Sequence, residues 1–229
     1  MTSRKLNRGG FIVALLAAAV GLLSMQRFAG AARVVAVPTP ALDIPSTAKT
    51  ETAVFAGGCF WGIQAVFEHM KGVQSAISGY SGGWVDRPAY EQVGSGTTGH
   101  AESVKVTFDP SQVSYATLLK VFFSVAHDPT QLNRQGPDVG TQYRSSIFYM
   151  TPEQKQQADA YIKQMTDAHV FSRPIVTQVV AYKSFFPAED YHQDYAEKHP
   201  DEPYIVYNDA PKVANLKKHY PDLYRDAIH

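Results

Sequence analysis

The chain has 229 residues, of which 45% are hydrophobic and 18% are charged, and its formal net charge at pH 7 is zero. This length suits one domain of ordinary size with a sizeable core. The balanced charge argues against nucleic acid or an anionic membrane surface as the main partner. A single cysteine excludes an intramolecular disulfide and argues against a zinc site built from thiolates.

The N-terminal segment has the pattern of a targeting signal. Basic residues at positions 4, 5 and 8 precede a continuous apolar run over 11–23, and Ala29-Gly30-Ala31 then gives a small-residue cleavage pattern. The apolar run is short for a membrane-spanning helix. We therefore predict a signal peptide over residues 1–31 and export to a bacterial periplasm. The alternative is an uncleaved N-terminal anchor.

The segment that follows, residues 32–50, is rich in Pro, Ala and Thr and is expected to form a linker or surface arm. Hydrophobic periodicity then predicts regular elements: strand 53–56, helix 61–70, strands 73–80 and 100–108, helix 114–126, strand 143–150, helix 151–168, strand 175–181 and a short helix over 188–198. The predicted domain spans 51–208, and an irregular C-terminal tail covers 209–229.

The order β-α-β-β-α-β in this series is that of the split βαβ, ferredoxin-like arrangement. It predicts an α+β fold, a two-layer sandwich in which helices pack on a mixed, mostly antiparallel sheet. Fold alone does not define function, so the chemistry has to be sought in individual residues.

The cysteine, Cys59, lies in the sequence Gly57-Gly58-Cys59-Phe60-Trp61-Gly62, at a predicted turn from strand to helix. Free backbone N–H groups and the helix dipole favour an anion at such a turn. We therefore expect the thiol to ionise more readily than a free cysteine and to act as a nucleophile. The two aromatic residues after it offer an apolar wall. The alternative is a small buried hydrophobe with no chemical role.

A candidate acid, Glu102, lies on the predicted strand 100–108. The alternation of this strand places Glu102 on the same face as Val104, Val106 and Phe108, which should be the buried face. Burial favours the neutral form of a carboxyl group, and a neutral carboxyl is a proton donor at neutral pH. The alternative is that the alternation fails at the start of the strand and leaves Glu102 in solvent.

Three further residues are candidates for a polar role beside the thiol. Tyr90 and Tyr143 border the two long irregular segments, where either hydroxyl could hydrogen-bond a ligand. The chain has 13 tyrosines, however, so a structural role for each remains open. Asp138, between Pro137 and Val139, has the position of an ordinary turn residue.

The histidines show no metal-binding spacing, and we predict no metal site. Folding could still bring His100 or His192 close to Cys59, which leaves a Cys-His hydrolase as a rival enzyme. A third hypothesis is a non-catalytic protein that captures oxidised or methionine-rich peptides in an aromatic pocket.

Three blocks of the sequence resemble one known family. They are Gly57-Gly58-Cys59-Phe60-Trp61-Gly62, Gly99-His100-Ala101-Glu102 and Gly140-Thr141-Gln142-Tyr143-Arg144-Ser145. All three are similar to peptide-methionine (S)-S-oxide reductase, the A-type methionine sulfoxide reductase, and the similarity runs from Val54 to Tyr207. The resemblance implies an oxidoreductase that reduces the S epimer of methionine sulfoxide, in proteins, peptides or the free amino acid, with no metal or organic cofactor.

The resemblance also implies a role for each candidate. Cys59 would attack the sulfoxide sulfur and become a sulfenic acid, and Glu102 would protonate the sulfoxide oxygen. Phe60 and Trp61 would hold the S-methyl group, and Tyr90 and Tyr143 would hydrogen-bond the oxygen. Asp138 would support the site through a hydrogen-bond network.

The C-terminal tail departs from the pattern of many family members, which carry a second cysteine there that resolves the sulfenic acid. Here the tail has none. The resemblance is therefore to members that lack the resolving cysteine, and it implies that a thioredoxin-like protein or a small thiol restores Cys59. We expect the enzyme to work as a monomer with no nucleic-acid partner.

Overall fold

The computed structural model describes residues 34–226. The predicted signal peptide over 1–31 lies outside these residues. Within the described part of the chain, none of the helices combines the length and the apolar character needed to cross a membrane.

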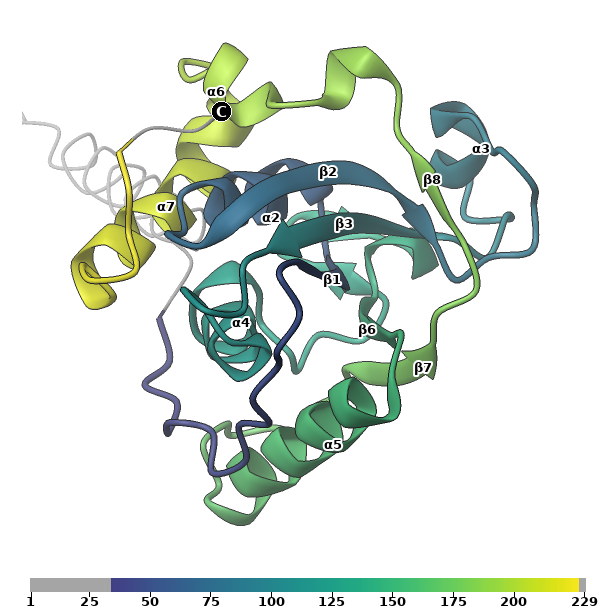
Figure 1. Ribbon diagram of the computed structural model, residues 1–229. Helices are drawn as coiled ribbons and strands as arrows, with labels where there is room; N and C mark the ends of the chain where they lie inside the picture. The colour runs from purple at the N-terminus through teal and green to yellow at the C-terminus, as the bar shows by residue number, and fades with distance from the viewer. Residues whose placement is uncertain (1–33, 227–229) are drawn as a thin grey trace, which may run out of the picture. The chain divides into compact units, whose positions relative to one another are not determined.

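A six-stranded sheet forms the centre of the fold, in the order β7-β6-β1-β3-β2-β8 (Figure 1). The four middle strands are β6 (Ser145–Tyr149), β1 (Glu51–Gly57), β3 (Ala101–Phe108) and β2 (Val73–Ser81), and they pair with one another antiparallel. At one edge β7 (Gln178–Ala181) pairs with β6 in parallel, and at the other β8 (Phe185–Pro187) pairs with β2 antiparallel. The predicted ferredoxin-like order and the mostly antiparallel, mixed sheet are confirmed.

The main core lies on one face of this sheet, against α2 (Phe60–Glu68), α4 (Tyr115–Val121), its continuation η1 (Phe122–Ala126) and α5 (Pro152–Asp167). Its centre is a stack of rings, in which Phe55 lies 5.2 Å from Phe67 and 4.9 Å from Phe122 between ring centroids. Burying such large rings is the dominant favourable contribution to folding. The helices on one face of the sheet confirm the α+β class.

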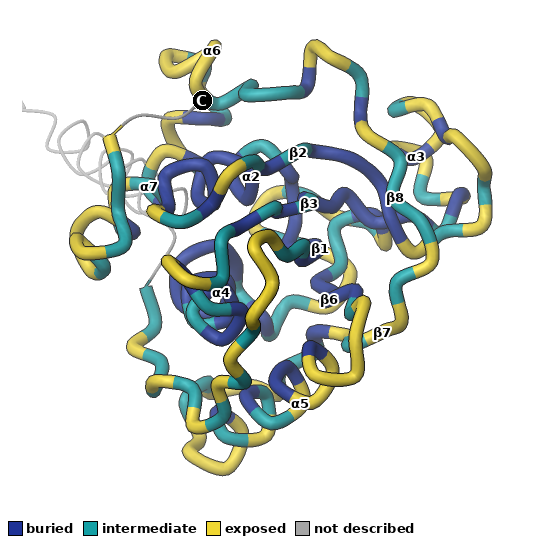
Figure 2. The backbone as a smooth tube through the Cα atoms, in the orientation of Figure 1, coloured by how far each residue is buried: buried dark blue, intermediate teal, exposed yellow. Residues whose placement is uncertain are grey.

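Strand β3 buries the predicted face. Glu102, Val104, Val106 and Phe108 are all buried, whereas Lys105 and Thr107 on the other face are partly exposed. Figure 2 shows the burial concentrated on the central strands and on α2 and α4. In the register of the sheet, Tyr80 on β2 lies directly opposite Glu102. Ala101 and Ser103 are buried as well, so both faces of the strand are covered at its start, and Glu102 is in the interior.

Short elements occupy the two long segments predicted to be irregular. The first contains α3 (Tyr90–Gly94), and the second contains the two-stranded pair β4 (Arg134–Gln135) and β5 (Asp138–Val139), followed by the 3₁₀ turn η2 (Thr141–Tyr143). These elements carry Tyr90, Asp138 and Tyr143.

The structure differs from the prediction after residue 181. The strand predicted over 175–181 is shorter, and the helix predicted over 188–198 is two separate turns, η3 (Asp190–His192) and α6 (Tyr195–Lys198). Asp194 lies between them with φ at 55°, a left-handed conformation that interrupts a helix. Residues 188–198 therefore do not form one continuous helix.

The C-terminal tail is not irregular. A π-helical turn, η4 (Ile205–Asp209), leads into α7 (Ala210–His219), which packs beside α2 (Figure 1). Asp209 occupies the N-cap position of α7, and Pro211 lies in its first turn, which is a favourable helix start. Helix α7 thus extends the folded unit beyond the predicted domain boundary at 208.

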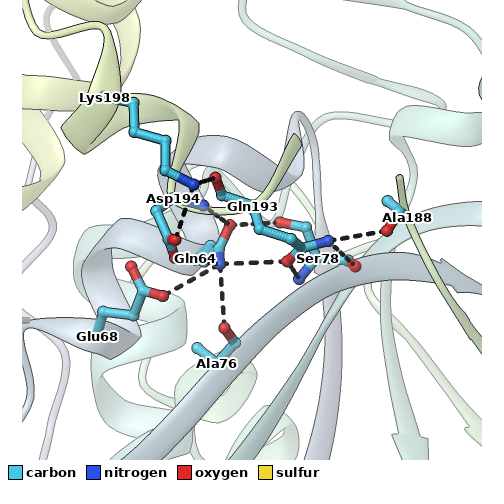
Figure 3. A network of polar contacts seen from close by, with 8 residues as sticks. All are labelled: Gln64, Glu68, Ala76, Ser78, Ala188, Gln193, Asp194 and Lys198. Atoms are coloured by element: carbon cyan, nitrogen blue, oxygen red, sulfur yellow. Dashed lines mark hydrogen bonds and ion pairs between the residues drawn. The ribbon is translucent and has the colours of Figure 1, made fainter. Parts of the chain in front are cut away.

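A network of side-chain amides fastens the segment 188–198 to α2 and β2 (Figure 3). The Gln64 amide donates to Glu68 and to the Ala76 carbonyl, while its oxygen accepts from the Ser78 hydroxyl. Gln193 in turn donates to the carbonyls of Ser78 and Ala188. This network fixes the position of the residues on η3 and α6, which reach the site described below.

Residues 34–50 form an extended arm, in agreement with the predicted linker or arm over 32–50 for the part that is described. Its backbone is held by side chains of α5: the Tyr161 hydroxyl donates to the Pro38 carbonyl at 2.7 Å, and the Gln164 amide donates to the Thr39 carbonyl at 2.9 Å. The arm therefore lies on the surface of α5.

Candidate active site

Cys59 occupies the N-cap position of α2, at the turn from β1, as the sequence predicts. Its side chain is 8% exposed. The preceding residue has to be glycine, because Gly58 has φ at +99° and an added Cβ would lie 2.5 Å from the Gln135 side chain. The turn is therefore closely covered by the β4–β5 pair.

The expectation that the Cys59 thiol ionises readily is wrong for this ligand-free structure. Burial raises the pKa of Cys59 well above its ordinary value, and the carboxyl groups of Glu102 and Asp209 raise it further. The Trp61 amide at the start of α2 and the Lys212 ammonium act in the opposite direction. Loss of water around the sulfur outweighs the helix N-terminus, so Cys59 is a protonated thiol at neutral pH.

Glu102 lies beside the same helix start. It is 2% exposed, and its Oε2 accepts a hydrogen bond from the Phe60 N–H at 3.0 Å. Burial raises the pKa of Glu102 to about 8, against the lowering effect of that hydrogen bond, with smaller raising effects from Asp138 and Asp209. Glu102 is therefore a neutral acid at pH 7, and the oxygen that Phe60 does not occupy is free to carry the proton.

Two tyrosine rings border the thiol and the acid. Burial and the charges of Glu102 and Cys59 raise the pKa of Tyr90 to about 12, and burial with the charge of Glu102 also raises the pKa of Tyr143. Both therefore remain hydroxyl donors. Neither hydroxyl hydrogen-bonds another group in the described part of the chain, which leaves both donors available to a bound polar atom.

An aromatic cluster completes the surroundings of the turn. The Trp61 ring stacks on Tyr195 with 3.8 Å between centroids and meets Tyr204 edge-on at 5.9 Å. Phe60 is fully buried and packs on His192 at 5.1 Å and on Tyr80 at 5.9 Å. These rings form the apolar wall that the sequence predicted from Phe60 and Trp61 alone.

Asp138 is not an isolated turn residue. On β5 it accepts a hydrogen bond from the Tyr204 hydroxyl, and burial raises the pKa of Asp138. Tyr204 in turn contacts the Trp61 ring. The pair therefore links the β4–β5 segment to the aromatic cluster.

The histidines have other partners. The Trp61 indole N–H donates to Nδ1 of His192 at 3.2 Å, and burial lowers the pKa of His192, so the ring is neutral. His100 contacts the Gly83 amide and the Val85 carbonyl. Over residues 34–226 no histidine hydrogen-bonds Cys59, so a Cys-His dyad is not formed. The same residues contain no group of three His, Cys, Asp or Glu side chains placed to hold a metal ion.

A buried thiol beside a neutral carboxyl group and an aromatic wall, with no histidine bonded to the thiol among residues 34–226, favours a thiol-dependent oxidoreductase over a Cys-His hydrolase. The family model for peptide methionine sulfoxide reductase matches residues 51–223. The chain belongs to this family.

Relatives in several bacteria support the assignment. The chain is 58% identical to peptide methionine sulfoxide reductase MsrA 2 of Mesorhizobium japonicum, over 81% of this chain and 95% of that protein. It is 49% identical to MsrA 2 of a Synechocystis species, over 90% of this chain and 96% of that protein.

Solved structures show the same fold. The reduced form of Mxr1 from Saccharomyces cerevisiae aligns with a TM-score of 0.60 and 29% identity, over 71% of this chain and 92% of Mxr1. Methionine sulfoxide reductase A of Corynebacterium diphtheriae aligns with a TM-score of 0.59 and 33% identity, over 73% and 88% of the two chains. The protein is therefore an A-type methionine sulfoxide reductase, an enzyme that reduces methionine sulfoxide to methionine.

Four residues at the site were not found from sequence: Tyr195, Tyr204, Asp209 and Lys212. The two tyrosines had no distinguishing context among the other tyrosines of the chain. Asp209 and Lys212 did have one, because an aspartate followed by Ala210-Pro211 is a helix start that would have predicted α7.

Proposed function

We propose that the enzyme reduces the S epimer of methionine sulfoxide through a sulfenic acid on Cys59, with Glu102 as the acid. The observation that carries this assignment is the shared position of the two groups at the start of α2. Cys59 is the N-cap residue, and Glu102 accepts the N–H of the very next residue. An acid with a pKa of about 8 in this place can protonate an oxygen bound to the sulfur under attack.

The reaction balances without any cofactor. The Cys59 sulfur attacks the sulfoxide sulfur while the Glu102 proton moves to the sulfoxide oxygen. The attack forms a bond between the two sulfur atoms, and the S–O bond then breaks as the hydroxyl moves to the Cys59 sulfur. The S–S bond breaks with its electron pair left on the substrate sulfur, and the products are methionine and a cysteine sulfenic acid. The thiol proton of Cys59 restores Glu102. In this proposal Tyr90 and Tyr143 hydrogen-bond the oxygen, and Phe60 and Trp61 hold the methyl group.

An external reductant must return the Cys59 sulfenic acid to the thiol. The chain has one cysteine, so no internal disulfide can form. Two thiols of an external reductant, a thioredoxin-like protein or a small thiol, take up the oxygen as water and leave as a disulfide. The substrate is methionine sulfoxide in proteins, peptides or the free amino acid, and we propose that the enzyme works as a monomer.

The test is a single turnover without reductant. Reduced protein is mixed with one equivalent of the S or the R epimer, and methionine and the trapped sulfenic acid are both quantified. We expect one methionine and one sulfenic acid per chain from the S epimer alone. Cys59→Ser is the control and should yield neither. Methionine formation by Cys59→Ser, or without oxidation of Cys59, would overturn the proposal.

We also propose that the protein is exported to the periplasm after cleavage near Ala31. The basic start, the apolar run and the small residues at 29–31 support this proposal. N-terminal sequencing of protein from the periplasmic fraction tests it, and an intact Met1 in the cytoplasm would contradict it.

A further inference from the structure

A buried ion pair lies on the first turn of α7. Lys212 Nζ is 3.1 Å from Asp209 Oδ1, and the two side chains are 9% and 0% exposed. The second carboxylate oxygen, Asp209 Oδ2, is buried with no hydrogen-bond partner among the described residues. Burying two charges costs solvation energy that the pair need not recover, so such a pair is weak evidence for stability. The pair therefore suggests a role other than stabilising the fold.

The ion pair lies against the helix turn that carries the nucleophile. A Cβ added to Gly62 would come 2.1 Å from Asp209 Oδ1 and 2.8 Å from Lys212 Nζ. Cys59 and Gly62 are three residues apart at the start of α2, and residues at this spacing lie on the same face of a helix. The two charges therefore fill the space that a side chain at 62 would take, one turn from the sulfur.

Charges at this range act strongly on a buried sulfur, because the interior screens them less than water does. Asp209 disfavours the Cys59 thiolate and Lys212 favours it. Five other titratable groups interact with Cys59: Glu102, Tyr90, Tyr143, Tyr195 and Tyr204. All five are acids, and Asp138 acts on Glu102. His192 beside Phe60 and His127 beside Gly57 are neutral, because burial lowers the pKa of both. Lys212 is the cation of this set.

We infer that Lys212 is a positioning residue for the nucleophile: its ammonium, held by Asp209 against Gly62, is the cation that stabilises the Cys59 thiolate. This inference rests on the proposed role of Cys59. The C-terminal helix, which contributes no thiol of its own, then contributes the cation that offsets part of the effect of burial and of the neighbouring carboxyl groups on the Cys59 thiol.

The test measures the ionisation of Cys59 directly. Because the chain has one cysteine, the pH dependence of alkylation by iodoacetamide reports this thiol alone. We compare the full chain with Lys212→Met, Lys212→Arg and Asp209→Asn. Lys212→Met should raise the alkylation midpoint by up to about one pH unit, so that up to about tenfold less thiolate forms at a given pH. Lys212→Arg should restore most of the difference.

Asp209→Asn gives the decisive comparison, because it should move the midpoint down rather than up. A merely structural pair would loosen the site in the same way whichever partner is removed. The double variant Asp209→Asn/Lys212→Met leaves no unpaired charge in the interior and should have an intermediate midpoint. If circular dichroism shows that a single variant does not fold, the double variant takes its place in the comparison.

An unchanged midpoint in Lys212→Met and in the double variant, or shifts of the same sign in Lys212→Met and Asp209→Asn, would overturn the inference. Neither result depends on sulfoxide reduction. The role of Cys59 itself is tested separately by Cys59→Ser, so failure of the proposed function and failure of this inference are distinguishable.

Discussion

Cys59 and Glu102 share a buried site in which the charge of Glu102 disfavours the Cys59 thiolate. Removal of water raises the pKa of both, so both groups hold their protons at neutral pH. This arrangement keeps an acid available at a pH where an exposed carboxyl would be ionised. The groups that favour the thiolate are the Trp61 amide and the Lys212 ammonium.

The pH profile of the reductive step should report the protonation of Glu102. In the wild type both groups hold their protons at neutral pH, so the single-turnover rate should be level there and fall above about pH 8, where Glu102 loses its proton. Glu102→Gln keeps an acceptor for the Phe60 N–H but has no acidic proton. We expect its rate to be lower by about 10²–10⁴ and to show no fall on the alkaline side. Stopped-flow measurement across this range checks it.

An unchanged rate and an unchanged alkaline fall in Glu102→Gln would remove Glu102 from the acid role. Alkylation of Cys59 provides the control, because the thiol of this variant should remain titratable.

Helix α7 makes the C-terminal segment part of the active site. It packs on α2, and the contact is close because Gly62 has no side chain. The preceding segment is fastened separately, by the amide network around Gln64 and Gln193 (Figure 3). Two short segments far from Cys59 in sequence thus bring Tyr195, Tyr204 and Lys212 to it.

Gly62→Ala should therefore destabilise the protein. A Cβ at 62 would overlap Asp209 Oδ1 and Lys212 Nζ, and overpacking of this kind typically costs about 1–3 kcal/mol. Gly94→Ala is the matched control, because α3 has nothing within 4 Å of an added Cβ there. It should be neutral or slightly stabilising. Urea denaturation of both variants checks the difference, and equal midpoints would contradict the packing.

The sequence correctly predicted the elements that are determined by the residue pattern within the element itself. The alternation of β3 placed Glu102 correctly, and the apolar spacing of α2 placed Cys59 at its start. Helix α7 was missed although Asp209 and Pro211 are a local start signal. The two turns of 188–198 were not predicted because tertiary contacts decide them: Asp194 is left-handed and its N–H donates to Gln64. The ionisation of Cys59 was predicted with the wrong sign, since burial is a property of the folded chain.

Residues 34–226 belong to one compact unit, and its interior holds two glutamates with raised pKa values. Burial raises the pKa of Glu68 to about 8, with a further contribution from Asp194, and burial raises that of Glu102 to the same value. For each group the folded-state pKa lies above the ordinary value of 4.5. The stabilising contribution of each is therefore complete below that ordinary value and is lost as pH rises toward 8.

The free energy of unfolding should accordingly fall as the pH is raised from about 5 to about 8. Glu68→Gln and Glu102→Gln should each flatten this dependence and be more stable than the wild type at the alkaline end, by roughly 1 kcal/mol or more. Thermal or urea unfolding at both pH values checks it. A wild-type stability that rises over this interval, unchanged by both variants, would contradict the assignment.

The contacts that hold the arm of residues 34–50 affect which of its residues can be exchanged during evolution. The arm is bound mostly through its own backbone: Pro38 and Thr39 offer carbonyl groups, and Ala41 and Ile44 offer amides, to side chains of α5. Backbone groups are the same whatever residue carries them. Selection should therefore act on Gln157, Tyr161 and Gln164 in the helix, while the arm itself tolerates exchange at most positions.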